Sequence, residues 1–435
     1  MALTRSYDEA VAALARLEGR GMKLGLERIE ALLQALGNPH HGLAGVLVAG
    51  TNGKGSVCAL VESMARAAGR STVMMTKPHL VSWCERIAVG GRPIDEERFA
   101  ELVFGVLDAA QRIPGDLGSA TVFELVTAAG VVAARDEGPD LLITEVGLGG
   151  RLDSTNVLDL GVAVVTGIAL DHRAELGDDI AGIATEKAAI IKPGNDVVTG
   201  ATGIALDVVR DAADRVGAAS FSAVGTDIAW EGEELGRAGV AVEIAAPFLR
   251  VRAPLIGGFQ ERNVAEAAQI CRTLTRRGTP IPDEAIVRGA ASVVWPGRMQ
   301  WIDGAPPLLV DGCHNAEAVA AMVAAATPLC AGRHTVAVFG AMADKDIDDM
   351  LQALRPLTSE VVFTEPSTAR AAPAHDLAAR WGDGAIVAPN VPAALITARA
   401  LAGAHGVVVA GGSLYTAGEI LAEEPLEAAQ ILNGS

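Results

Sequence analysis

Aromatic residues are scarce in this chain of 435 residues, in which Phe, Trp and Tyr together make up 3%. Half of the residues are nevertheless hydrophobic, and only 20% are charged. A chain of this length can bury a large core, so that core must consist mainly of Ala, Val, Leu and Ile. The length also favours two or three domains over one.

Cysteine is rare as well, and no CxxC pair occurs among Cys58, Cys84, Cys271, Cys313 and Cys330. Their odd number and irregular spacing argue against a disulfide framework and for reduced thiols, which predicts a cytoplasmic protein. The first residues mix acids and bases through their apolar positions, unlike a secretion signal. No run of about 18 uncharged apolar residues occurs, which argues against a membrane span.

Positive charge is in deficit, with 35 Lys and Arg against 53 Asp and Glu and a net charge of -18. Such a surface repels a phosphate backbone, so we expect no nucleic-acid partner. An anionic ligand would need a local pocket of positive charge.

Short apolar stretches alternate with helical patterns through the first two thirds of the chain. Helices are predicted within 1–35, over 56–68 and over 259–275, and local strands near 240–244. The other predicted strands of this part are 46–49, 71–76, 141–146 and 162–166. Strands separated by helices indicate a parallel, doubly wound sheet.

A second series of strands begins after Trp295-Pro296-Gly297, where Pro and Gly interrupt the pattern. Its predicted strands are 308–310, 335–339, 361–364, 385–388 and 407–410. We therefore expect an α/β protein with two domains. Residues 1–296 would form a mostly parallel, P-loop-type sheet domain, and 297–435 a smaller, Rossmann-like α/β domain.

The strongest local signal is VLVAGTNGKGSVCAL, in which a strand leads through a glycine-rich turn into a helix. Gly50, Gly53 and Gly55 allow backbone N–H groups to approach phosphate, and Lys54 adds a full positive charge. Ser56 offers a hydroxyl to phosphate or magnesium. The loop departs from a strict Walker A sequence, because Gly55 separates the lysine from the hydroxyl.

Two further residues follow predicted strands. Glu145 ends the strand in DLLITEVGLGGRLDSTNV, and His172 follows the strand at 162–166. Ligands of open α/β sheets bind beyond the carboxyl ends of strands, where a carboxylate can hold Mg²⁺. We therefore predict Glu145 as a magnesium ligand, and we expect Ser56 and His172 to lie at the same edge of the sheet.

These segments and others resemble those of folylpolyglutamate synthases and dihydrofolate synthases, which are related to the Mur ligases. The motifs occur in that family's order over roughly residues 20–420: GTNGKGS, TKPHL, TVFELVT, EVGLGGRLDSTNV, ALDHRAELG, EKAAIIKPG, WPGRMQ, DGCHNAEA, FGAMADKD and GGSLYTAGE.

The resemblance implies an ATP-dependent carboxylate–amine ligase that adds L-glutamate to dihydropteroate, a reduced folate, or both. ATP would phosphorylate the substrate carboxylate, and the amine of glutamate would displace phosphate from the acyl phosphate. The implied cofactors are ATP, two Mg²⁺ ions and a carbamate on Lys187. Lys54, Lys187 and His172 would be the catalytic residues, and Glu145, His172 and Ser56 would hold magnesium.

The resemblance also implies two sets of binding residues. The ATP site would comprise Gly53, Lys54, Gly55, Ser56, Asn263, Arg298, Asp311 and His314. The folate side would comprise Gly25, Leu26, Thr121, Phe123, Glu124, Leu152 and Asp153.

Lys77 departs from the family pattern, which has a magnesium-binding Ser at this position. A protonated ammonium has no lone pair for a metal, so either the metal site is rebuilt or Lys77 supplies charge in its place. We expect its side chain to be able to reach the phosphates. Cys313 and Ala316 also replace the usual Ala and Pro, but these substitutes are small.

Two alternatives remain open. One is a Mur-type ligase for a different carboxylate, although the segment before Val46 is short for the extra N-terminal domain of those enzymes. The other is a nucleotide-binding relative that lost catalysis at Lys77, which a pterin-dependent ATP turnover assay would distinguish. We expect a monomer, and the choice of pterin substrate and the glutamate chain length are left open.

Overall fold

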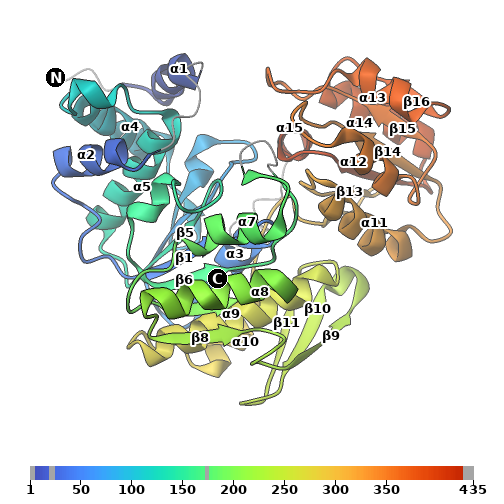
Figure 1. Ribbon diagram of the computed structural model, residues 1–435. Coiled ribbons are helices and arrows are strands. Elements are labelled where there is room, and N and C mark those ends of the chain that lie inside the picture. Colours follow the sequence, from blue (N-terminus) through green and yellow to red (C-terminus); the bar gives the residue numbers. More distant parts are fainter. Residues whose placement is uncertain (1–4, 19–24, 172–175, 425–435) are drawn as a thin grey trace. The chain divides into compact units, whose positions relative to one another are not determined.

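The computed structural model describes residues 5–18, 25–171 and 176–424. Contacts divide the chain into two compact units, each with its own sheet (Figure 1). Unit 1 comprises residues 1–230, 244–249 and 263–290, and unit 2 comprises 231–243, 250–262 and 291–435. The α/β class with two parallel-rich sheets is confirmed, and the boundary near residue 297 stays a prediction.

The sheet of unit 1 has eight strands in the order β4-β3-β2-β5-β1-β6-β7-β8. Strands β2, β5, β1, β6, β7 and β8, which are neighbours in this order, are parallel to one another. Strand β3 is antiparallel to β2, and β4 is antiparallel to β3. After β1 the chain first adds strands on one side of β1 (β2 and β5) and then on the other side (β6 and β7). The carboxyl end of β1 is therefore a topological switch point, the place where such sheets bind ligands. The strands are β1 (Gly45–Ala49), β2 (Thr72–Met75), β3 (Ile87–Val89), β4 (Arg92–Pro93), β5 (Leu141–Glu145), β6 (Gly161–Val165), β7 (Asp196–Thr199) and β8 (Ser220–Ala223).

Helices cover both faces of this sheet, because alternate strand residues point to opposite sides. On one side, Leu47 and Ala49 of β1 join a core with residues of α1, α2, α4, α5, α7 and α8. These helices are α1 (Tyr7–Glu18), α2 (Glu27–Ala35), α4 (Glu96–Ala110), α5 (Val122–Glu137), α7 (Ile180–Ala188) and α8 (Gly203–Val216).

On the other side, α3 (Lys54–Ala67) contacts the central strands. Helix α10 (Asp283–Ala291) packs so closely on α3 that a Cβ on Gly289 would lie 2.3 Å from Met64 Cα. Helix α9 (Phe259–Arg276) also meets α3, where Cys271 Sγ lies 3.6 Å from Met64 Sδ. Both contacts involve Met64, so they fix the last turn of the helix that follows the glycine-rich loop.

Several shorter elements complete the two units. A three-stranded sheet has the order β11-β10-β9, with β9 (Trp230–Glu234), β10 (Val240–Ile244) and β11 (Leu249–Ala253). The 3₁₀ helices are η1 (Trp83–Arg86), η2 (Gly115–Leu117), η3 (Ser154–Val157) and η4 (Gly236–Ala238).

The main sheet of unit 2 has six strands in the order β12-β13-β17-β14-β15-β16, parallel except for β12. Helices α11 to α13 pack on one face with Phe339 and Phe363, and α14 and α15 contact the same strands. The elements are β12 (Gln300–Ile302), β13 (Leu308–Val310), α11 (Ala316–Cys330), β14 (Thr335–Phe339), α12 (Ile347–Leu354), β15 (Val361–Phe363), α13 (Ala374–Trp381), β16 (Ala385–Val387), α14 (Val391–Ala402), β17 (Val407–Gly411) and α15 (Leu414–Glu423).

The predicted strands and the helix at 259–275 are confirmed, with ends that shift by one or two residues. The core also matches the composition, because Ala, Val, Leu and Ile supply most buried side chains. All five cysteines are free and buried. No helix in the described ranges combines the length and apolarity that crossing a membrane requires.

A buried ion pair ties α2 to the start of α5. Arg28 Nη2 lies 3.0 Å from Glu124 Oε1, and the two side chains are 9% and 2% exposed. Glu124 also completes a capping box with Thr121 at the N-terminus of α5. Removing one member would leave the other charge buried, which costs far more than losing a surface pair.

We therefore predict that Arg28→Ala destabilises unit 1 by about 3 kcal/mol or more. The matched control is Arg210→Ala, which removes an exposed ion pair with Asp227 in the same unit. Thermal melting should show a clear drop for the first variant and little change for the second. Equal melting temperatures for both variants would contradict a stabilising role for the buried pair.

Candidate functional site

The glycine-rich loop between β1 and α3 is held by the end of β6. The N–H of Thr51 donates to the carbonyl of Gly167 at 2.8 Å, and the Thr166 hydroxyl donates to the carbonyl of Asn52 at 2.7 Å. A Cβ on Gly50 would lie 1.8 Å from Thr166 Oγ1, and Gly50 has a φ of 151°. Glycine is therefore required at this position by both space and backbone conformation.

Two lysines meet at the carbonyl oxygen of Gly50. Lys54 Nζ donates to it at 3.0 Å and to the carbonyl of Thr51 at 2.9 Å. Lys187 Nζ, from the end of α7, donates to the same Gly50 oxygen at 2.9 Å. The structure thus brings together two of the predicted catalytic residues, which lie far apart in the sequence.

Lys187 is 5% exposed. Burial, and then the nearby positive charge of Lys54, lower the pKa of Lys187 to about 7, against the opposing influence of Asp171 and Asp153. A neutral amine is nucleophilic, whereas an ammonium is not. Near neutral pH this lysine is therefore a reactive amine as well as a hydrogen-bond donor.

The predicted metal ligands Glu145 and Ser56 are both buried at the same edge of the sheet. Glu145 ends β5 beside β1, with Val48 as its register partner, and Ser56 lies in the first turn of α3. His172 lies outside the described residues. Within the described ranges, no group of three or more His, Cys, Asp and Glu could hold a metal. One carboxylate and one hydroxyl suit Mg²⁺, which relies on few protein ligands.

Asn263 of α9 lies at the glycine-rich loop. Gly53 is the N-cap of α3 with a φ of 88°, and a Cβ there would lie 2.5 Å from Asn263 Oδ1. Gly55 and Ser56 follow as buried residues of the first turn of α3. The predicted ATP-binding residues of unit 1 are therefore close together.

Thr121 and Glu124, predicted on the folate side, bond to each other. Glu124 Oε2 accepts hydrogen bonds from the N–H and the hydroxyl of Thr121 at 2.7 and 2.8 Å. Arg28 occupies the same carboxylate. The structure therefore gives both residues a local role in fixing the start of α5.

Phe123, between them in the sequence, packs its ring against Gly147. A Cβ on Gly147 would lie 2.6 Å from this ring and 3.2 Å from Asp153 Oδ2. The Asp153 carboxylate accepts N–H groups of Gly147 at 3.0 Å and Leu148 at 2.9 Å, and the N–H and hydroxyl of Thr155 at 2.9 and 2.5 Å. It thereby holds the loop after β5 in place under Phe123.

The other three residues predicted on the folate side lie just before α2 and in the loop after β5. Gly25 and Leu26 precede α2, and Leu26 packs against the core of unit 1. Leu152 is half-buried beside Asp153.

Unit 2 brings together Arg298, Asp311 and His314 near the carboxyl end of β13. The Asp311 carboxylate accepts the N–H groups of Met299 and Cys313, each at 2.8 Å. Burial raises the pKa of Asp311, and the nearby Arg298 opposes that rise. A Cβ on the intervening Gly312 would lie 2.4 Å from Arg298 Nη1, and the Gly312 carbonyl lies 3.1 Å from His314 Nδ1.

Lys77 follows β2 and adjoins the predicted metal ligand. Its backbone N–H donates to Glu145 Oε2 at 3.0 Å. Its ammonium lies 4.2 Å from the centre of the Phe123 ring and 3.4 Å from the Thr127 hydroxyl. The side chain is thus directed to α5 in this structure, and its reach toward the phosphates stays a prediction.

His79 is a residue of this edge that the sequence analysis did not assign. Arg86 Nε donates to His79 Nδ1 at 2.8 Å, and both side chains pack against the Trp83 ring. Burial and then Arg86 lower the pKa of His79 to about 3, so the imidazole is neutral with its proton on Nε2. The sequence feature that could have pointed to His79 is its place in the TKPHL motif, two residues after Lys77.

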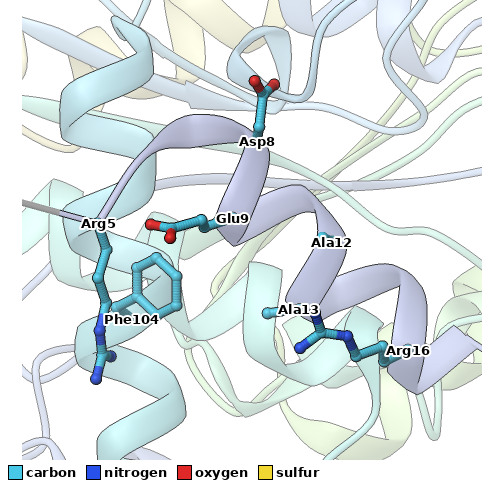
Figure 2. Close-up of a pocket in the computed structure, with 7 residues that line it drawn as sticks. All are labelled: Arg5, Asp8, Glu9, Ala12, Ala13, Arg16 and Phe104. Atoms are coloured by element: carbon cyan, nitrogen blue, oxygen red, sulfur yellow. The ribbon is translucent and has the colours of Figure 1, made fainter.

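A separate hollow of about 400 Å³ lies between α1 and α4 (Figure 2). It is lined by Arg5, Asp8, Glu9, Ala12, Ala13, Arg16 and Phe104. None of these residues was predicted as functional, and the charges of both signs suit no single class of ligand.

Comparisons with known proteins agree on one family. The model of the Mur ligase glutamate ligase domain matches residues 297–414. A dihydrofolate synthase/folylpolyglutamate synthase of Bacillus subtilis is 35% identical over 364 residues, which cover 82% of this chain and 84% of the relative. A probable bifunctional folylpolyglutamate synthase/dihydropteroate synthase of Haloferax volcanii is 36% identical over 422 residues. That match covers 95% of this chain, which spans only 50% of the relative.

Solved structures show the same likeness over nearly the whole chain. Mycobacterium tuberculosis folylpolyglutamate synthase, complexed with ADP and AMPPCP, has a TM-score of 0.90 and 29% identity, with 97% and 99% of the two chains covered. A bifunctional folylpolyglutamate synthase/dihydrofolate synthase with Mn, AMPPNP and L-glutamate bound has a TM-score of 0.84 and 30% identity, with 98% and 100% covered.

If the loop binds phosphate as predicted, Gly50→Ala should strongly weaken nucleotide binding, because the new Cβ would push the loop away from Thr166. We expect the Kd for ATP, measured by titration calorimetry, to rise at least about 100-fold, as for the loss of two charge-assisted contacts. Gly105→Ala is the control, since a Cβ there meets nothing within 4 Å. Unchanged affinity in a folded Gly50→Ala protein would show that the loop does not bind phosphate.

Proposed function

Because the chain belongs to the folylpolyglutamate synthase/dihydrofolate synthase family of ATP-dependent ligases, we propose that it adds L-glutamate to dihydropteroate, reduced folates, or both. The observation that carries this proposal is the meeting of Lys54 and Lys187 at the Gly50 carbonyl, beside Glu145 at the switch point of the sheet. The full positive charge of Lys54 at the N-terminus of α3 suits the phosphates of ATP.

In the proposed reaction, a carboxylate oxygen of the pterin substrate attacks the γ-phosphorus of ATP, and ADP leaves. The amine of glutamate then attacks the carbonyl carbon of the acyl phosphate, phosphate leaves, and the new amide loses the extra amine proton. The chain's part is to position the reactants and to compensate the charge on the transferring group.

Each predicted residue has a part in this proposal. The N–H groups from Gly53 to Ser56 and the ammonium of Lys54 would hold the phosphates, with Asn263 beside them. Glu145, Ser56 and the predicted ligand His172 would hold Mg²⁺, which supplies charge compensation when bound. In unit 2, Asp311 would orient the backbone around Arg298 and His314 for contacts with ATP.

The folate-side assignment gains support from the packing around Phe123. Its ring is fixed by Gly147 and flanked by Lys77, and offers an apolar surface for the flat ring of a pteroate. Asp153 and the Thr121–Glu124 capping box would act by shaping this surface. Leu26 and Leu152 would add apolar area.

Lys187 is proposed to act as a carbamate. Its neutral nitrogen would attack carbon dioxide, forming an N–C bond and releasing one proton. A burial-lowered pKa of about 7 makes this amine available, and the resulting anion would relieve the repulsion between Lys187 and Lys54. A carboxylate there would also suit a site rich in magnesium. The free thiols are consistent with the cytoplasm as the proposed compartment.

The ligase proposal is tested with purified protein, ATP, Mg²⁺ and glutamate against dihydropteroate and tetrahydrofolate in parallel. We expect glutamate incorporation with at least one acceptor, and a loss of about 100-fold or more in Lys54→Ala. Arg380→Ala, which removes an exposed pair with Asp348, is the control. ATP hydrolysis without pterin dependence would instead favour a relative that lost ligase activity.

The carbamate has a readout that does not need turnover. With ¹³C-bicarbonate, wild-type protein should show a carbamate carbon signal by NMR that is absent in Lys187→Ala. The neutral fraction of the amine should rise from about 10% at pH 6 to about 90% at pH 8, so the signal should grow over that range. Short carboxylic acids should partly restore activity to Lys187→Ala. A fully active Lys187→Ala protein would rule the carbamate out.

A further inference from the structure

The ammonium of Lys77 has little to bind in the described part of the chain. It has three N–H donors, yet its polar contact is one long hydrogen bond of 3.4 Å to the Thr127 hydroxyl. Its other contact is the face of Phe123, 4.2 Å from the ring centre. A cation held this way retains most of its capacity to bind an anion.

The nearby carboxylates do not neutralise Lys77 through direct pairing. Asp153 directs its two oxygens to four donors of the loop after β5. Glu145 accepts the backbone N–H of Lys77, whereas the ammonium is directed to Thr127 and Phe123. Both acids act on Lys77 only from a distance, where they raise its pKa, while burial lowers that pKa to about 8.

The backbone of Lys77 places this ammonium at a useful point. Its N–H is fixed to Glu145, the proposed magnesium ligand, while its side chain extends over Phe123, the proposed aromatic surface of the folate side. A pteroate lying on that surface carries its carboxylate at one end of a flat aryl ring. A carboxylate that is to be phosphorylated must approach the phosphate site, and the backbone of Lys77 adjoins Glu145 at that edge of the sheet.

We infer that Lys77 binds the carboxylate of the pterin substrate that is to be activated, and that it rests on Phe123 until this carboxylate arrives. This inference depends on the proposed function, because it names the contact through which that substrate is recognised. The physical gain is the exchange of one long hydrogen bond for charge-assisted ones. Lys77 is then a substrate-binding residue, with a role that a hydroxyl at this position would not supply.

The test compares pteroic acid with its primary carboxamide, which has the same rings but no negative charge. Binding of each is measured by fluorescence quenching in one magnesium-containing buffer, with no turnover required. Wild-type protein should bind the acid at least about 10-fold more tightly than the amide, as expected for a charge-assisted hydrogen bond. Lys77→Met should lose this preference, and Lys77→Arg should keep part of it.

Thr127→Val is the matched control, because it removes the hydroxyl partner of Lys77 and leaves the cation. If Lys77 serves only to support α5, Thr127→Val and Lys77→Met should both leave the preference for the acid unchanged, which would overturn the inference. If Lys77→Met does not fold, as judged by thermal melting, Lys77→Gln takes its place under the same criterion.

The two proposals fail in different ways. Equal preference for the acid in wild type and Lys77→Met, with normal glutamate ligation by the wild type, refutes the role of Lys77 alone. A wild-type protein that ligates glutamate but binds pteroic acid and its carboxamide equally well also refutes only the role of Lys77. A wild type that binds neither compound and ligates nothing refutes the proposed function and this inference together.

Discussion

The carbonyl oxygen of Gly50 is the point on which the site in unit 1 depends. It accepts hydrogen bonds from Lys54 and Lys187, and it stays in place because Thr166 and Gly167 hold the loop against the end of β6. Lys54 brings a positive charge to this edge of a chain whose net charge is -18, while the lowered pKa of Lys187 leaves part of that amine neutral near pH 7. Under the proposed function, Lys54 and the N-terminus of α3 would face the phosphates of ATP.

Burial lowers the pKa of two lysines at this edge, and neighbouring charges add to or oppose that effect. Lys187 is buried and close to Lys54, so its charged form is disfavoured and its pKa falls to about 7. Lys77 is half-buried over an aromatic ring, and its pKa falls less, to about 8. The same physical effect thus yields a reactive amine at one position and a cation that remains mostly charged at neutral pH at the other. This difference underlies the separate roles proposed for them.

Small residues make this arrangement possible in a protein with few aromatic side chains. Gly289 lets α10 approach α3 closely, and Gly147 lets the ring of Phe123 lie directly on the loop after β5. Some of the few aromatic residues form two small groups. Phe339, Phe363 and Trp381 pack edge to face in unit 2, and Tyr7, Trp83 and Phe99 form a group in unit 1. Close backbone packing thereby replaces bulky side chains as the source of rigidity.

The sequence by itself determined the alternation of strands and helices, the glycine-rich loop before α3, and the position of Glu145 at a strand end. These features depend on local periodicity and on residues adjacent in the chain, which a sequence displays directly. Only the tertiary structure decided that Lys187 and Asn263 reach the loop, and that Arg28 and Thr121 occupy Glu124. Likewise, only the tertiary structure showed that Lys77 lies over Phe123 and that Arg86 bonds to His79. Those contacts depend on how distant segments pack and on how far each charge is removed from water, and neither is written in local spacing.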